Sequence, residues 1–159
     1  LIFMYTASTL YHSFMNPAVK RVLKIIDHSS IFLLIAGTYT PFFLITLRHD
    51  VSWLLLGIIW LLAAAGIVFR IAFQNQFQKI YLSVYLAMGW MILFAIEPLM
   101  RNLPPAGIIL LFLGGFFYTL GLIFYGWRHL AFHHTIWHIF VIAGSLCHFC
   151  CILFFVIPR

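Results

Sequence analysis

The stretch VSWLLLGIIWLLAAAGIVFRIAF, residues 51–73, decides the class of fold. It carries a single charge, Arg70, and it exceeds the roughly 20 apolar residues that a helix needs to cross a bilayer. A backbone surrounded by hydrocarbon has no water to satisfy its polar groups, so such a stretch crosses the membrane as an α-helix. The sequence therefore predicts a membrane-spanning helix here.

The composition of the whole chain extends this prediction. Apolar residues make up 65% of the chain and charged residues 8%, and the mean hydropathy is +1.10. Soluble domains are roughly 45–50% apolar and about 25% charged. We therefore expect an integral membrane protein whose solvent is membrane lipid. The net charge of +6 is then a signal of topology and of attraction to anionic lipid, and we expect no nucleic-acid partner.

Breaks in hydrophobicity divide the chain into apolar runs that predict about six helices and one all-α transmembrane domain, residues 1–159. The runs cover residues 1–14, 22–47, 51–73, 80–99, 106–127 and 134–157. All but the first are long enough to span a bilayer. Pro41 should kink the second run, and the spacing of Gly115 and Thr119 would permit close helix packing in the fifth.

The beginning of the chain suggests that a helix is incomplete there. The sequence starts Leu1-Ile2-Phe3, without a methionine or a signal peptide, and its first apolar run stops at Phe14. We interpret the chain as an N-terminally truncated fragment that lacks the first part of this helix.

The basic residues between the runs predict the orientation, because cytoplasmic loops are enriched in Lys and Arg. With alternating loops, one side receives six cations and the other receives three. The richer side should be cytoplasmic, which places residue 1 and the C-terminus outside. The two sets are Lys20, Arg21, Lys24, Arg70, Lys79 and Arg128, against Arg48, Arg101 and Arg159.

Three clusters of polar residues interrupt the apolar runs. Ser8 and His12 are four residues apart and so share one helix face, as do His134 and His138, while Asp27 stands at the start of the second run. Ionisable groups cost roughly 2.5–3.5 kcal/mol at the centre of a membrane helix, which makes each a functional candidate. The predicted topology brings all three clusters to a similar depth near the cytoplasmic face.

Together the clusters match the ligand set of a catalytic zinc site, which is three histidines, a nearby carboxylate and an open position. Each residue also has a simpler interpretation. His12 could bond at a helix interface, Ser8 could bond its own helix, and His134 with His138 could be interfacial anchors. Asp27 could be a carboxylate at a helix N-terminus or a partner of Lys24.

Other polar residues are assigned no part in this site. His148 lies about 15 Å along the helix from His138, and we expect it to bond to a neighbouring helix. His28 is expected to point away from Asp27. Three cysteines are interpreted as small apolar residues, namely Cys147, Cys150 and Cys151.

The same residues carry a resemblance to a known family. Four segments resemble the bacterial haemolysin III proteins, which are related to the progestin and adipoQ receptors and, more distantly, to alkaline ceramidases. The resemblance covers essentially the whole chain, and its S-x3-H, D and H-x3-H elements occur in the right order. The segments are STLYH, KxxDHSSIFLLIAGTYTPF, GGFFYTLGLIFY and HTIWHIFVIAGSLCHF.

This resemblance implies a seven-helix bundle, with the six runs as its helices two to seven. We expect a bacterial inner membrane, because the short loops leave no room for an extracellular binding domain within these residues. It implies a Zn²⁺ ion near the cytoplasmic side, bound by His12, His134 and His138. Ser8 and Asp27 would then surround a water bound to the metal.

The leading functional hypothesis is zinc-dependent hydrolysis of a lipid amide or ester. Zinc would acidify the bound water and polarise the substrate carbonyl, Asp27 would act as general base, and Ser8 would orient Asp27 or the water. Two alternatives are not enzymatic. One is a sensor in membrane homeostasis, and the other is a pore-forming or cytolytic protein, although no run shows a continuous polar stripe for a pore.

Overall fold

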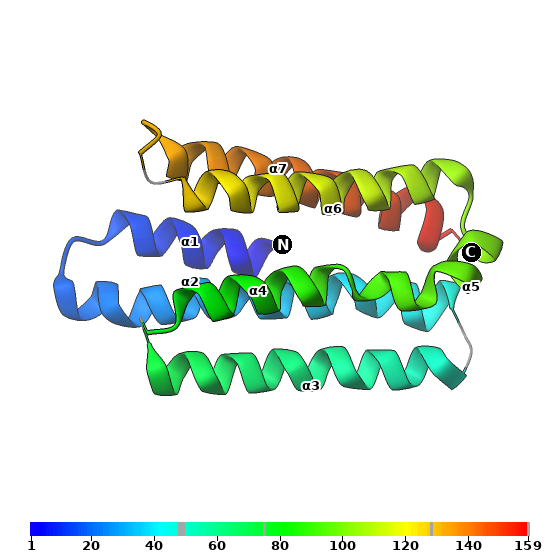
Figure 1. Cartoon of the computed structure of the whole chain (residues 1–159), viewed down its shortest axis with the longest axis horizontal. Coiled ribbons are helices and arrows are strands. Elements are labelled where there is room, and N and C mark those ends of the chain that lie inside the picture. The colour runs from blue at the N-terminus through cyan, green and yellow to red at the C-terminus, as the bar shows by residue number, and fades with distance from the viewer. Residues whose placement is uncertain (48–49, 75, 128, 159) are drawn as a thin grey trace. The chain divides into compact units, whose positions relative to one another are not determined.

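The computed structural model describes residues 1–47, 50–74, 76–127 and 129–158, and helices account for nearly all of them (Figure 1). No strand occurs in these four ranges. The prediction of an all-α membrane protein with about six helices is confirmed. The elements are α1 (Ile2–Ser13), α2 (Pro17–Pro41), η1 (Phe42–Thr46), α3 (Asp50–Phe73), α4 (Gln78–Gly89), η2 (Met91–Ala95), α5 (Ile96–Asn102), α6 (Pro105–Gly126), α7 (His133–Cys151) and η3 (Ile152–Val156).

Five helical segments are long and apolar enough to cross a membrane, whereas α1 is shorter. Some of these segments consist of consecutive elements. The helix α2 continues into the π-helical turns of η1, and α7 continues into those of η3. The segments are Pro17–Thr46, Ser52–Phe73, Gln78–Asn102, Pro105–Gly126 and His133–Val156. Of the cations used to predict topology, Arg48, Arg128 and Arg159 lie outside the described residues.

The start of α2 differs from the prediction. The helix begins at Pro17, where the missing N–H of proline costs nothing, and Asn16 precedes it as a cap. The Asn16 Oδ1 atom accepts hydrogen bonds from the backbone N–H groups of Ala18 at 3.0 Å and Val19 at 3.3 Å. Asp27 is therefore well inside the helix. The interpretation of Asp27 as a carboxylate at a helix N-terminus is wrong.

The type of helix changes at Pro41, where the sequence predicts a kink. The α-helical hydrogen bonds end at Pro41 and π-helical turns follow over Phe42–Thr46, where the backbone N–H of Leu47 bonds the carbonyl of Phe42 at 2.9 Å. Proline has no N–H to donate and its ring crowds the preceding turn, so the helix must rearrange here.

The chain forms two compact units. The first, unit 1, comprises Leu1–Thr40 and Leu54–Met88, and the second, unit 2, comprises Pro41–Trp53 and Gly89–Arg159. Unit 1 thus contains α1 and most of α2, α3 and α4. Unit 2 contains α5, α6 and α7 with their flanking turns.

Unit 1 is packed around α2. The fully buried ring of Phe32 lies 4.6 Å from the ring of Tyr85 on α4, measured between centroids. On its α3 side, the same ring occupies the space that a Cβ atom at Gly66 would need. The Tyr85 hydroxyl donates a hydrogen bond of 2.8 Å to the carbonyl of His28. These contacts fix the α2 turn that carries Asp27 and His28.

Unit 2 is built on α6 and α7, which run antiparallel and side by side (Figure 1). Glycines at intervals of seven line the α6 face in contact with α7: Gly107, Gly114 and Gly121. The predicted pair, Gly115 and Thr119, instead faces the indole of Trp90, whose Nε1 donates to the Thr119 hydroxyl at 3.1 Å.

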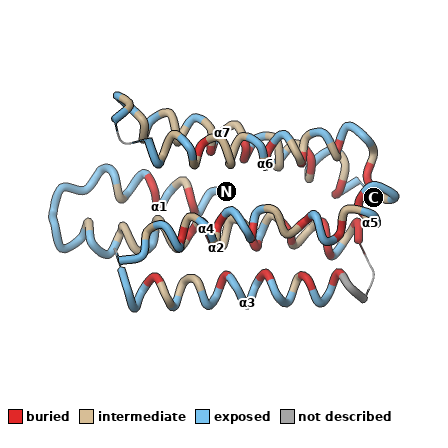
Figure 2. The backbone as a smooth tube through the Cα atoms, viewed as in Figure 1, coloured by how far each residue is buried: buried red, intermediate tan, exposed pale blue. Residues whose placement is uncertain are grey.

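Much of α3 is exposed (Figure 2), including several of its large apolar residues. Leu54, Leu61 and Val68 recur at intervals of seven and are 64%, 70% and 66% exposed. A helix surface this apolar is stable only against hydrocarbon, so the pattern agrees with a lipid-facing position.

Candidate metal centre

Ser8 on α1 is buried and joins its helix to α2 in unit 1. Its hydroxyl makes a side-chain hydrogen bond with the carboxylate of Asp27. The neighbouring Thr9 behaves differently, because its hydroxyl donates to the carbonyl of Tyr5 in its own helix at 2.8 Å. The Ser8 hydroxyl therefore has a hydrogen-bond partner on a neighbouring helix.

Asp27 is half-buried and has polar neighbours on three sides. Besides Ser8, it interacts electrostatically with His12 on α1 and with Arg70 on α3. The Nδ1 atom of His28 lies 3.7 Å from the Asp27 Oδ2 atom, so the expectation that His28 points away from Asp27 is wrong. That Nδ1 also lies 2.8 Å from the carbonyl oxygen of Lys24, to which it donates a hydrogen bond.

Arg70 is buried, although the topology prediction counts it among the cations between the apolar runs. Its side chain is 3% exposed, and its guanidinium lies 4.9 Å from the ring centroid of Tyr81. It interacts electrostatically with both Asp27 and Lys24. Its position within the apolar run 51–73 was the signal that pointed to burial, because a charge inside such a run needs a partner.

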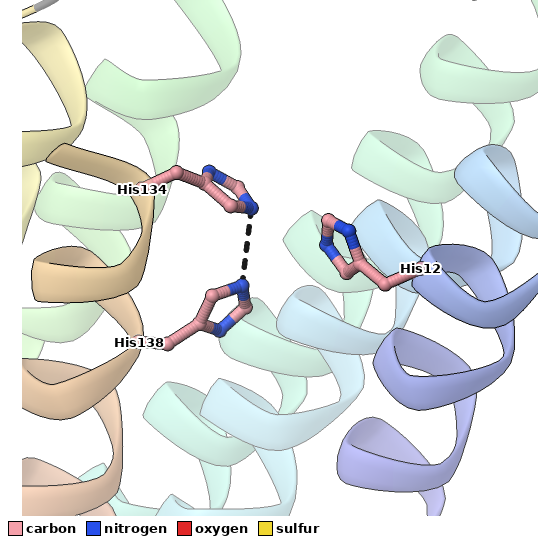
Figure 3. Close-up of side chains that lie close together, drawn as sticks. All are labelled: His12, His134 and His138. Atoms are coloured by element: carbon pink, nitrogen blue, oxygen red, sulfur yellow. Dashed lines mark hydrogen bonds between the residues drawn. The ribbon is translucent and has the colours of Figure 1, made fainter. Parts of the chain in front are cut away.

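His134 and His138 lie on one face of α7, in unit 2, and their rings approach each other through their Nε2 atoms (Figure 3). Their Nε2 atoms are 3.1 Å apart, and their rings are nearly perpendicular at a centroid distance of 4.6 Å. Two imidazoles on a tetrahedral zinc ion, at about 2.0–2.1 Å each, would have their nitrogens about 3.3 Å apart. The 3.1 Å contact is a hydrogen bond between the two rings, and its length is close to the spacing of two ligands of one metal ion.

His12, His134 and His138 form a group that could hold a metal ion (Figure 3). Three neutral imidazoles are a donor set that suits Zn²⁺ and leaves one coordination position open. The residues present therefore fit the metal that the sequence predicts.

His148 has a separate role, as predicted. Its Nε2 atom lies 3.0 Å from the carbonyl oxygen of Leu111 on α6, which is a hydrogen bond to a neighbouring helix. The thiol of Cys151 likewise donates to the carbonyl of Gly107 at 3.1 Å. Cys147 and Cys150 are also free thiols. The buried contact of Cys151 supports the interpretation of that cysteine as a packing residue.

Comparison with known proteins places the chain in a family. The model of the family described as "Haemolysin-III related" matches residues 1–149. Hemolysin-3 of Bacillus cereus is 51% identical over 158 residues, which are 99% of this chain and 72% of that protein. The Hemolysin-3 homolog of Bacillus subtilis (strain 168) is 49% identical over 155 residues, which are 98% of this chain and 73% of that protein.

A more distant relative comes from animals. The human monocyte to macrophage differentiation factor is 27% identical over 152 residues, covering 92% of this chain and 63% of that protein. No solved structure shows a significant match. The match of the family model over nearly the whole chain, together with relatives at about half identity, shows that this chain belongs to the haemolysin III family.

Proposed function

We propose that this protein uses a zinc ion, bound by His12, His134 and His138, to hydrolyse an amide or ester bond of a membrane lipid. The observation that carries the proposal is the 3.1 Å separation of the His134 and His138 Nε2 atoms, which suits two ligands of one ion. Three histidine ligands leave a fourth position for water, as catalytic zinc sites do.

Zinc, when bound, supplies an acidified water and a Lewis acid for the carbonyl of the substrate. The residues around Asp27 supply the rest. The Asp27 carboxylate accepts a proton as general base, and the hydrogen bond from Ser8 holds that carboxylate in one orientation. Arg70 partly balances the negative charge of Asp27 within a buried environment.

The substrate in this proposal is a lipid that enters from the bilayer. The apolar outer surfaces of the helices offer lipid-facing access, and the resemblance to ceramidases points to an amide or ester bond. We place the protein in a bacterial inner membrane, with the cation-rich ends of the helices in the cytoplasm and the C-terminus outside, in agreement with the positive-inside rule.

The test is lipid hydrolysis by the zinc-loaded, full-length protein in nanodiscs that contain ceramides and glycerolipids, with released fatty acid measured by mass spectrometry. Asp27→Asn should keep the zinc and slow turnover by roughly 10²–10⁴-fold, as expected for loss of a general base. Glu97→Gln is the matched control, because the Glu97 carboxylate is exposed and paired with Arg101 at 2.6 Å. Undiminished turnover in Asp27→Asn would remove Asp27 from the role of base.

A second candidate function is membrane lysis, which the name Hemolysin-3 indicates for the Bacillus cereus relative. Dye release from liposomes by the purified protein tests it directly. If neither Asp27→Asn nor removal of zinc changes the dye release, lysis is favoured over hydrolysis. If the release requires both Asp27 and zinc, it is a consequence of the hydrolysis.

A further inference from the structure

A cleft of about 290 Å³ opens in unit 1 where α1 ends, α2 begins and α3 ends. Three basic side chains line it, together with an aromatic and an amide side chain. They are Lys20, Arg21 and Lys24 of α2, Tyr11 of α1, and Gln74 after α3. The cleft therefore brings together three cations and further hydrogen-bond donors from three helices.

None of the described residues that line this cleft is acidic. Asp27 is engaged with Ser8 and Arg70, and Glu97 is paired with Arg101. Like charges gathered around a cleft repel one another, and an anion between them would relieve that repulsion.

A cation–π contact and the N-terminal end of α2 also contribute to this cleft. The Lys20 Nζ atom lies 5.6 Å from the centroid of the half-buried Tyr11 ring, within the range of a cation–π interaction. The start of α2, at Pro17, also lines the cleft, and Asn16 caps it. The positive end of the α2 dipole therefore adds to the charge of the side chains.

Exposed apolar residues lie next to the cleft residues in sequence. Val19 and Val22 accompany the lysines on α2, and Phe73 immediately precedes Gln74. The basic cleft thus lies at the ends of helices long enough to span a membrane, and exposed apolar residues stand beside its lining in the sequence. An anionic lipid has the complementary structure, because its charged headgroup is joined to apolar chains.

We propose that this cleft binds the phosphate of an anionic phospholipid headgroup, with Lys20, Arg21 and Lys24 as its charged contacts. This site does not rest on the proposed hydrolysis. Basic groups close to a membrane surface contribute enough attraction, roughly fivefold in affinity for each charge, to retain such a lipid.

The experiment measures binding to the full-length protein in a zwitterionic detergent, by native mass spectrometry, of three probes: dioctanoyl phosphatidic acid, dioctanoyl phosphatidylcholine and inorganic phosphate. Phosphatidic acid should bind at least tenfold more tightly than the other two. Equal binding of inorganic phosphate would overturn the lipid assignment in favour of a soluble phosphate ligand. No preference for phosphatidic acid over phosphatidylcholine would overturn the site altogether.

A pair of double variants distinguishes the cleft from general attraction between charges. Lys20→Gln/Arg21→Gln removes two cleft charges and should weaken phosphatidic acid binding by roughly 25-fold. Lys79→Gln/Arg101→Gln removes two charges outside the cleft lining and should change it less than threefold. Equal losses in the two variants would contradict a specific site.

One further variant separates this proposal from the zinc site. His134→Ala/His138→Ala should bind phosphatidic acid as the parent does, because the histidines do not line the cleft. If that variant lost the lipid while Lys20→Gln/Arg21→Gln kept it, the phosphate would bind at the metal and the cleft assignment would be wrong.

Discussion

The imidazole of His148 on α7 lies in the space that a side chain at Gly114 on α6 would fill. From there its Nε2 atom reaches the Leu111 carbonyl oxygen at 3.0 Å, and its ring meets the edge of Tyr118 at a centroid distance of 5.4 Å. Hydrophobic burial does not hold helices together in lipid, so close packing at small residues and hydrogen bonds between helices must do so. The pair shows both within one contact.

Gly114→Ala should destabilise unit 2. The new methyl group would collide with the His148 ring, which cannot retreat without breaking its bond to Leu111, and overpacking of this kind costs about 1–3 kcal/mol. The measurement is unfolding of the purified protein in mixed micelles by SDS titration. Gly126→Ala is the control, because its Cβ atom would meet nothing within 4 Å, and equal stability of the two variants would contradict the packing described.

Tyr118→Phe should also weaken the contact between α6 and α7. The Tyr118 hydroxyl and the Ser145 hydroxyl are 2.7 Å apart, and hydrogen bonds between membrane helices average about 0.6 kcal/mol with a maximum of about 1.7 kcal/mol. A double-mutant cycle with Ser145→Ala, measured by the same titration, should give a coupling energy in that range. A coupling indistinguishable from zero would show that the bond adds no stability.

Arg70 and Asp27 should be energetically coupled in unit 1. Both charges are removed from solvent and attract each other, so Arg70→Met leaves a carboxylate with less compensation. Interacting groups of this kind show coupling energies of about 0.5–3 kcal/mol. We expect the double variant Asp27→Asn/Arg70→Met to lose less free energy of unfolding than the two single variants lose together. Losses that simply add would contradict the interaction.

Ser8→Ala should lower the proposed activity without removing zinc. Loss of a hydrogen bond that orients a residue at a metal site typically costs about 10–100-fold in activity or metal affinity, and here we expect the loss in kcat. Thr9→Ala is the matched control, because the Thr9 hydroxyl donates to the carbonyl of Tyr5 in its own helix. Equal activity of the two variants would contradict the positioning role of Ser8.

Much of the fold could be predicted from the sequence because lipid imposes one requirement on every spanning segment. A run such as residues 51–73 must be apolar and helical, and the His134–His138 spacing places both rings on one helix face. The start of α2 was misplaced because Asn16-Pro17 was interpreted as a break between helices. The same two residues are also a cap and a first-turn proline.

The features that could not be predicted depend on which helices meet. The contact of Gly114 with His148 joins residues 34 positions apart, and no local pattern identifies a partner at that distance. The burial of Arg70 beside Tyr81 and Asp27 likewise follows from the packing of three helices. Hydropathy locates such helices without specifying which of their faces touch.

The proposed function requires that His12, His134 and His138 bind zinc. The most direct measurement is the zinc content of the full-length protein, purified without chelators, by inductively coupled plasma mass spectrometry, beside the variants His12→Ala and His134→Ala/His138→Ala. We expect close to one zinc ion per parent molecule and almost none in either variant. A parent without zinc, or variants that keep it, would show that these histidines are not zinc ligands.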